Sequence, residues 1–397
     1  MAQRSARQYD FESILHPISK KQFFEDYWEK KPLLIRRKDR AYYGDLLTLE
    51  ALDRVITSNT LTNSNAFIAN ARNPVDAKAY TFPDGVVDLA RLYQQFADGG
   101  TIGFNQLHTF VPRLHDFCRS LERELSCRFQ TNIYMTPPGS QGFPPHYDSH
   151  DVFILQVHGT KHWQIFDTPI ELPFRGQSFK RAETPVGAVT MEFDLEPGDM
   201  FYLPRGIMHD AQTREGETLH ITVGALQTTW TEAVLEAVAK MALSDLEMRR
   251  SLPPGYARTE FDRTEARAKF KEMFRRLAER ADADAALDHF ADDLVSSRTA
   301  LLEGQLMQVL GLSKLSLDDR VGARPNLLYR YREKDGQFIV SCYGAEMRLP
   351  AYAAEPTRYA LETASFAVRD LPGDLDDEGK LVLIKRLVRE GMVHKLA

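Results

Sequence analysis

Three side chains in the middle of the sequence are of the types that hold a divalent transition metal. His146 and Asp148 lie two residues apart, and His209 follows after Pro204-Arg205-Gly206. On a strand, side chains two residues apart point to the same face. Two imidazoles and one carboxylate form the facial set that holds non-heme Fe(II) and leaves other coordination positions open. A chelating 2-oxoacid and dioxygen can occupy those positions, so the pattern indicates an oxygenase centre.

Lys161 is the next residue that could do chemistry. It opens the segment Lys161–Phe166, in which strand alternation places Lys161, Trp163 and Ile165 on one face. If that face looks into a barrel, the ammonium needs an anion, because an unpaired buried charge is costly. Alternatively, Lys161 lies in the turn after Gly159 and is solvated. The pattern leaves both interpretations open.

Other histidines follow the same region without a spacing that suits a metal. We interpret these as structural residues, and His150 is the one nearest to the proposed ligands in sequence. They are His150, His158, His162 and His220.

Short strand-like segments, separated by Gly and Pro, surround these residues and predict a sandwich or jelly-roll barrel. The predicted strands are Arg128–Thr136, Asp151–Val157, Lys161–Phe166, Val189–Phe193, Met200–Leu203 and Leu219–Leu226. Before them we expect a strand at Leu33–Ile35 and helices at Lys20–Glu29, Leu89–Phe96 and Leu114–Leu125, with a weakly patterned stretch at Thr57–Asn73. After them we expect helices at Thr231–Glu247, Glu260–Arg280 and Ala283–Leu310. The last part predicts strands at Tyr329–Tyr331, Phe338–Cys342 and Met392–Leu396, and a helix at Gly379–Glu390 that ends at Gly391.

The composition excludes several classes of protein. The chain has 397 residues, 43% hydrophobic and 27% charged, which is typical of a globular protein of two or three domains. Its three cysteines are too few for a disulfide framework and match no zinc motif. No apolar run is long enough to span a membrane, and the start lacks the apolar core of a signal peptide, so we expect a cytoplasmic protein. The net charge of −6 argues against nucleic acid as the main partner.

The segment Gly198–His209 resembles the second sequence motif of the cupins in the spacing of its glycines, proline and histidine. The first cupin motif is present in altered form: Gly159 falls at the expected spacing, but Val152 replaces the motif's glutamate. The resemblance implies a double-stranded β-helix in which Asp148 supplies the carboxylate, as in Fe(II)/2-oxoglutarate oxygenases.

The run Gly159-Thr160-Lys161-His162-Trp163 resembles the JmjC-domain oxygenases. In that family a lysine fifteen residues after the first histidine ligand binds the distal carboxylate of 2-oxoglutarate. Lys161 has that place relative to His146, so the resemblance implies that it binds the cosubstrate.

The run Asn132–Asp148 resembles one JmjC branch more closely, the ribosomal oxygenases, which hydroxylate side chains of ribosomal proteins. In that branch an asparagine fourteen residues before the first histidine contributes to the 2-oxoglutarate pocket, and Asn132 matches it. Tyr134 shares its strand face, and the strand that contains Thr222 is also similar to the branch, which implies cosubstrate contacts from both. The branch can have a serine after that strand, where this chain has Gly224.

The resemblance implies an α+β protein in three parts. Residues 1–228 would form the JmjC/cupin domain with N-terminal helices, 229–310 a helical dimerisation region, and 311–397 a winged-helix-like domain. The last part carries 14 Lys and Arg against 13 Asp and Glu. Because its charge is nearly balanced, we expect it to pack or to orient a substrate rather than to bind nucleic acid.

The function that follows is an Fe(II)- and 2-oxoglutarate-dependent protein hydroxylase that consumes O2 and produces succinate and CO2. The metal ligands would be His146, Asp148 and His209. The resemblance implies an Arg or His of a ribosomal protein as the substrate. The alternatives are an oxygenase of a free amino acid, a peptide or methyl-lysine, a non-enzymatic metal-binding scaffold, and a transcriptional regulator.

Overall fold

The computed structural model describes residues 7–396. The opening residues, in which we expect no signal peptide, lie partly outside that range. The chain folds as two compact units, of which the first ends at Gln227 and the second begins at Thr228. Within the described range, no helix is both long and apolar enough to cross a membrane.

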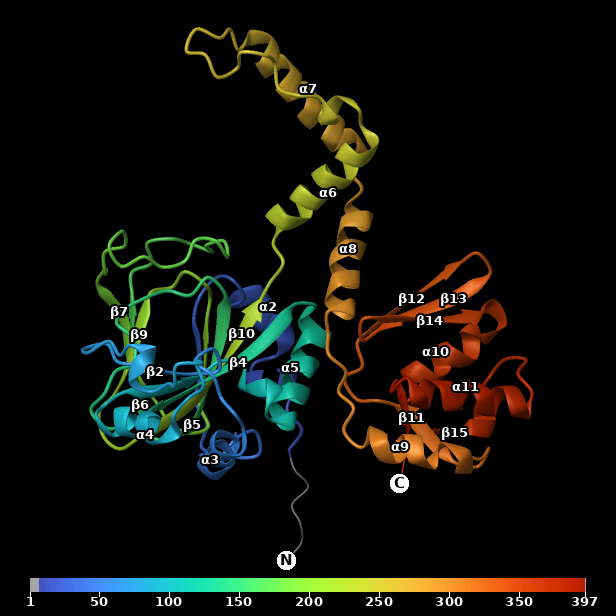
Figure 1. Cartoon of the computed structure of the whole chain (residues 1–397), viewed down its shortest axis with the longest axis horizontal. Coiled ribbons are helices and arrows are strands. Elements are labelled where there is room, and N and C mark those ends of the chain that lie inside the picture. The colour runs from blue at the N-terminus through green and yellow to red at the C-terminus, as the bar shows by residue number, and fades with distance from the viewer. Residues whose placement is uncertain (1–6, 397) are drawn as a thin grey trace, which may run out of the picture. The chain divides into compact units, whose positions relative to one another are not determined.

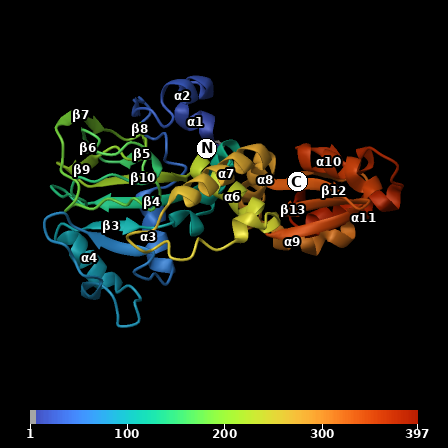
Figure 2. The ribbon, with the colours of Figure 1, turned by 90° about the horizontal axis from the view of Figure 1, so that it is seen from above.

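A seven-stranded and a three-stranded antiparallel sheet form the jelly-roll barrel of the first unit (Figure 1, Figure 2). From edge to edge, the larger sheet contains β1 (Leu33–Ile35), β8 (Met200–Leu203), β5 (Asp151–His158), β10 (Thr218–Leu226), β4 (Arg128–Thr136), β3 (Thr101–Phe104) and β2 (Ala66–Ala69). The smaller sheet contains β7 (Val189–Leu195), β6 (Lys161–Phe166) and β9 (His209–Thr213).

Strand β10 shows how the larger sheet separates the core from the barrel interior. It pairs with β4 on one side and with β5 on the other. Leu219, Ile221 and Val223 belong to the main hydrophobic core and are fully buried. His220 and Thr222 alternate with them and line a pocket instead. Because side chains alternate along a strand, one strand serves both the core and the pocket.

Helices of the first unit add their apolar side chains to that core. They are α1 (Phe11–Leu15), α2 (Lys20–Asp26), α3 (Leu49–Ser58), α4 (Leu89–Ala97) and α5 (Pro112–Leu125). Phe11 and Phe23 pack against Phe153 of β5, with ring centroids 6.1 and 5.8 Å away. Ser19 caps the N-terminus of α2, and its hydroxyl accepts a hydrogen bond from Gln22 N.

The second unit begins with helices. They are α6 (Trp230–Ser244), α7 (Thr264–Arg280), α8 (Ala283–Ser296) and α9 (Gln305–Gly311). The single helix predicted over Ala283–Leu310 is therefore wrong, because α8 ends at Ser296. Gly304 precedes α9 with φ +75°, a left-handed conformation that interrupts a helix and favours glycine.

The C-terminal part has its own hydrophobic core and two three-stranded sheets. The strands are β11 (Arg320–Ala323), β12 (Tyr329–Lys334), β13 (Gln337–Cys342), β14 (Ala345–Pro350), β15 (Phe366–Ala367) and β16 (Val393–Lys395). The helices are α10 (Ala354–Glu362) and α11 (Asp377–Arg389). Gly391 follows α11 with φ +74°, as expected at a helix end. Arg332 pairs with Glu346, and Arg358 pairs with Glu333, so these arginines do not present unopposed charge. The winged-helix assignment stays a prediction.

Candidate metal centre and adjoining pocket

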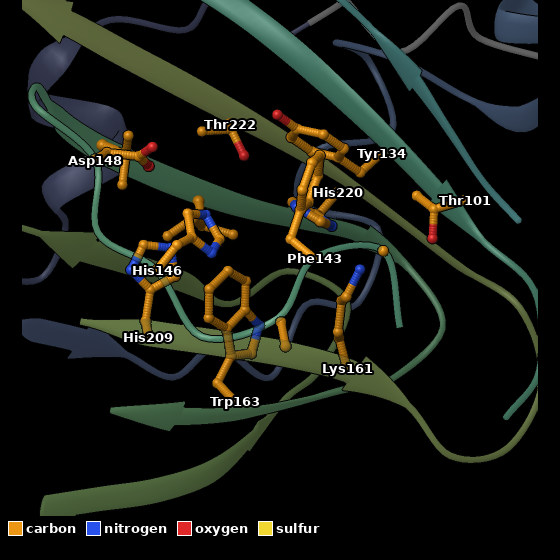
Figure 3. A pocket seen from close by; sticks show the side chains of 14 residues that line it. Thr101, Tyr134, Phe143, His146, Asp148, Lys161, Trp163, His209, His220 and Thr222 are labelled. Carbon is orange, nitrogen blue, oxygen red and sulfur yellow. The ribbon is translucent and has the colours of Figure 1, made fainter. Parts of the chain in front are cut away.

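The three predicted metal ligands lie together. His146, Asp148 and His209 each offer one ligand atom, and these atoms lie within 4.8 Å of one another (Figure 3). The Nδ1 atoms of the two histidines lie 2.9 and 3.0 Å from the carbonyl oxygens of Pro144 and Ile207. With Nδ1–H donating to a carbonyl, each Nε2 keeps its lone pair for a metal. The donor set therefore fits a divalent transition metal.

Backbone hydrogen bonds hold the ligand-bearing segments side by side. His146 and His209 form an isolated β-bridge, with N···O distances of 3.0 and 2.8 Å. The backbone N–H of Gly206 donates to the carbonyl oxygen of Asp148 at 2.9 Å. The expectation that His146 and Asp148 share a strand is wrong, because both precede β5 in an extended loop. The shared site results from the bridge to His209 rather than from strand alternation.

The electrostatics of the site favour the protonation states that bind metals. Burial lowers the pKa of His209 to about 4, and the neighbouring imidazole of His146 adds to this effect. Although burial opposes it, the imidazoles of His150, His146 and His209 hold the pKa of Asp148 below its ordinary value. A neutral imidazole and an ionised carboxylate are the ligand forms, so at neutral pH little proton release is needed.

Lys161 points into the barrel, so the interpretation as a solvated turn residue is wrong. It is the first residue of β6, its side chain is 3% exposed, and its Nζ donates to Thr136 Oγ1 at 2.9 Å. Burial lowers its pKa to about 7. The strand begins here because Gly159 makes the preceding turn at φ +64°, where an added Cβ would lie 2.0 Å from Glu217 O.

Lys161 and the three ligands line a single pocket of about 230 Å³. Figure 3 shows the ammonium at one end of it and the ligands at the other, with Trp163 between them. The complete lining is Thr101, Tyr134, Gly142, Phe143, His146, Asp148, Val152, Ile154, Lys161, Trp163, His209, Ala211, His220 and Thr222.

The remaining predicted site residues divide into two groups. Tyr134 and Thr222 line the pocket, and their contacts with the cosubstrate stay a prediction. Asn132 is not part of the lining; its Oδ1 accepts a hydrogen bond from the backbone of Gln106 at 3.2 Å, and it lies beside the hydroxyl of Tyr134. Asn132 lies opposite Thr222 in the β4–β10 pair and two residues from Tyr134, so it is on the pocket face of β4, and its role toward the cosubstrate stays a prediction.

Two pocket residues that the sequence analysis did not name as site residues have unsatisfied polar atoms. Trp163 Nε1 and His220 Nδ1 are buried without a hydrogen-bond partner in the described part of the chain. Burial, helped by the charge of Lys161, lowers the pKa of His220 well below its usual range, so this ring is neutral. Their positions could have been found, because Trp163 lies two residues from Lys161 on β6 and His220 lies two residues from Thr222 on β10, so each shares a strand face with a predicted site residue. Buried polar atoms of this kind indicate a polar ligand.

The other histidines have structural partners. His150 fills the space beside Gly224, where an added Cβ would lie 2.8 Å from the imidazole ring, so a serine there would require that ring to move. His158 lies 3.1 Å from Glu217, and His162 lies 2.8 Å from Asp194.

Residues 104–233, which include all of this pocket except Thr101, match the family described as JmjC domain. This chain carries a JmjC domain. Of the curated proteins, the NO66 bifunctional lysine-specific demethylase and histidyl-hydroxylase of Aedes aegypti is 31% identical over 298 residues. That match covers 72% of this chain and 47% of NO66. Ribosomal oxygenase 2 of Mus musculus is 34% identical over 254 residues, covering 61% of this chain and 54% of that protein.

The JmjC chain is therefore a homologue of the ribosomal oxygenases, and it spans about half the length of these curated relatives. Among solved structures it is similar to YcfD, a ribosomal oxygenase from Escherichia coli in complex with cobalt and succinic acid. The TM-score is 0.56 at 16% identity, and the match covers 96% of this chain and 99% of YcfD. A YcfD complex with cobalt and 2-oxoglutarate gives a TM-score of 0.53 at 14% identity, with the same coverage. This likeness establishes a shared fold.

Proposed function

We propose that this protein is an Fe(II)- and 2-oxoglutarate-dependent hydroxylase that acts on an Arg or His side chain of a ribosomal protein. The observation that carries the proposal is the pairing, in one pocket, of a metal-binding triad with a buried ammonium. The triad leaves coordination positions open, and the ammonium of Lys161 provides a binding point for a carboxylate at the far end. A metal alone would need no such cation.

The pocket residues fit both partners. His146, Asp148 and His209 offer two nitrogens and one oxygen, which is the donor set of non-heme iron oxygenases. Burial accounts for the lowered pKa of Lys161, and in the described part of the chain no carboxylate contributes to it. A dicarboxylate would supply that missing charge. When bound, iron with 2-oxoglutarate activates O2 to oxidise a C–H bond, and yields succinate and CO2.

The protein's own residues bind, orient and exclude water. Lys161 holds the distal carboxylate together with the hydroxyl of Thr136, to which it already donates. Asn132 and Tyr134 of β4 and Thr222 of β10 contribute to the cosubstrate pocket. Trp163 stacks against the His209 ring, with centroids 5.9 Å apart, and keeps water away from the ligand.

The names of the relatives support a protein substrate and raise a second candidate. Ribosomal oxygenase 2 and the histidyl-hydroxylase activity in the name of NO66 favour hydroxylation of a ribosomal protein. NO66 is also named a lysine-specific demethylase, which favours methyl-lysine as the alternative. Mass spectrometry of treated ribosomal proteins and methyl-lysine peptides separates them, because hydroxylation adds one oxygen whereas demethylation removes a methyl group.

The helices of the second unit support homodimerisation. Large apolar side chains on α6 and α7 are exposed to solvent, an arrangement typical of a protein interface. They include Trp230 (81% exposed), Leu243 (81%), Phe270 (65%) and Phe274 (58%). Light scattering should give twice the chain mass for the wild type and the chain mass for Phe270→Ser/Phe274→Ser. A monomeric wild type would contradict dimerisation. The cytoplasmic location expected from the sequence stays a prediction.

An anaerobic titration tests the enzyme assignment. Fe(II) and 2-oxoglutarate should give the visible charge-transfer band of their chelate with the wild type. Lys161→Ala should weaken the band, whereas Lys180→Ala, which removes a lysine that is 65% exposed, should leave it unchanged. Absence of the band in folded, iron-loaded wild type would overturn the oxygenase assignment.

A further inference from the structure

A network of charged and polar side chains lies behind the metal ligands, and the proposed chemistry does not use it. It joins Asp151 at the start of β5, Arg205 in the loop before β9, Tyr202 of β8, and Glu29 from the N-terminal segment. The side chains of Asp151 and Arg205 are 0% and 9% exposed. Because charged side chains are seldom buried unless they are paired, this network calls for an explanation.

The network connects the two loops that carry the metal ligands. Asp151 follows Asp148 by three residues, and Arg205 precedes His209 by four. Asp151 Oδ1 accepts hydrogen bonds from the backbone N–H of Arg205 at 3.1 Å and from its Nη1 at 3.2 Å. One carboxylate oxygen of Asp151 therefore fixes both the main chain and the side chain of Arg205, near the start of the loop that leads to His209.

Tyr202 and Glu29 hold the Asp151–Arg205 pair in place. The hydroxyl of Tyr202 donates to Asp151 Oδ2 and accepts from the backbone N–H of Glu29 at 2.9 Å. The carboxylate of Glu29 pairs with Arg205 Nη1. Each carboxylate oxygen of Asp151 thus has a donor, and the guanidinium lies between two carboxylates.

Stability alone does not account for this arrangement. Burial raises the pKa of Asp151 above its ordinary value, although Tyr202 and Arg205 favour the charged form. Buried ion pairs often stabilise a fold no better than apolar side chains of the same size, because their desolvation offsets their attraction. Their directional bonds do fix geometry, and here they fix the two loops whose side chains must meet at a metal.

We infer that Asp151, Arg205, Tyr202 and Glu29 are positioning residues that set the separation of the Asp148 and His209 loops and thereby the affinity of the metal site. The inference rests on the metal triad and not on the cosubstrate or the substrate. Residues that orient metal ligands from behind typically contribute about 10- to 100-fold to metal affinity.

The test uses Co(II) alone, bound to the full chain and followed by its visible absorption. Asp151→Asn keeps the shape of the side chain and removes its charge, and should raise the Kd for Co(II) by about tenfold or more. Glu122→Gln is the matched control, because Glu122 is 3% exposed, pairs with Arg119 at 2.9 Å in α5 and accepts a hydrogen bond from Phe129 N of β4 at 3.2 Å, so its printed bonds join α5 to β4. It should lower the melting temperature while leaving the Kd for Co(II) unchanged.

Folded Asp151→Asn with wild-type Co(II) affinity would overturn the inference, as would an equal loss of affinity in Glu122→Gln. If Asp151→Asn does not fold, Tyr202→Phe decides, because it removes only the hydroxyl that donates to Asp151. It should weaken Co(II) binding by up to about fivefold, the equivalent of one hydrogen bond, and unchanged affinity would reject the inference. If the wild type binds no Co(II), the metal-site assignment itself is wrong, and the proposed function, which depends on that site, fails as well.

Discussion

Replacing Lys161 with methionine should stabilise the ligand-free protein while abolishing cosubstrate binding. The pKa of Lys161 falls from an ordinary 10.5 to about 7 because the side chain is buried. At about 1.36 kcal/mol per pKa unit, the charged form is disfavoured in the folded state by about 5 kcal/mol. The unfolded chain holds this proton more strongly, so the full cost is present below pH 7, falls as the pH rises, and is gone above 10.5.

Lys161→Met removes that cost with a side chain of similar length. It also removes the hydrogen bond to Thr136, which contributes about 1 kcal/mol, so a gain of at most about 4 kcal/mol is expected at pH 6.5. Urea unfolding of the metal-free protein measures this gain. In a second measurement, calorimetry with Co(II) and 2-oxoglutarate should detect cosubstrate binding in the wild type and none in the variant.

The exposed Lys180 supplies the control, because Lys180→Met should change neither the stability nor the binding. A less stable Lys161→Met would show that the ammonium has a compensating partner in the folded protein. Binding of 2-oxoglutarate by the variant would show that the cation is not its anchor. The first result would refute the reasoning from burial, and the second would refute the proposed role of Lys161 in cosubstrate binding.

Three further predictions concern the same pocket. Because binding of 2-oxoglutarate requires the charged form of Lys161, the affinity for 2-oxoglutarate should fall about tenfold from pH 6 to pH 8. Calorimetry in buffers of different ionisation enthalpy should detect proton uptake on binding. An affinity that does not change with pH would contradict the pKa of about 7. His209→Ala should lose Co(II) binding, whereas His158→Ala, a half-exposed imidazole outside the pocket, should keep it; equal retention in both would exclude His209 as a ligand. In urea unfolding, the free energy of unfolding of Gly159→Ala should be lower than that of Gly216→Ala by at least about 2 kcal/mol. Both glycines have φ near +65°, but only at Gly159 would an added Cβ lie against backbone atoms. Equal losses of stability in the two variants would show that the turn at Gly159 relaxes.

Much of the barrel could be predicted because its strands are apolar and end at glycine or proline. The segments Arg128–Thr136, Lys161–Phe166 and Met200–Leu203 were predicted with the bounds that the structure shows. Strand β9 was missed because His209-Asp-Ala-Gln-Thr has no apolar alternation. Its strand conformation results from pairing with β6, which is a tertiary effect that local pattern does not contain.

The candidate site likewise contains residues that the sequence could predict and residues that it could not. The metal triad was predictable because its residue types and spacing are rare in combination, and its ligand atoms do converge. The direction of Lys161 was not, because alternation gives the face of a strand but not which face is the interior. His220 was interpreted as a structural residue but lines the pocket, because the pairing of β10 with β4 places it opposite Tyr134 on the interior face; the role of Asn132 toward the cosubstrate stays a prediction.

Strand β10 has a consequence for how variants of this protein should be interpreted. Along residues 219–223 its side chains alternate between the hydrophobic core and the pocket, so a one-residue slip would turn the imidazole of His220 into the hydrophobic core and bring Ile221 to the pocket. Folding of the barrel and assembly of the pocket are therefore one event. A mutational screen for lost activity should identify substitutions at Ile221 and Val223 as well as at the metal ligands, although both side chains lie in the hydrophobic core and not in the pocket.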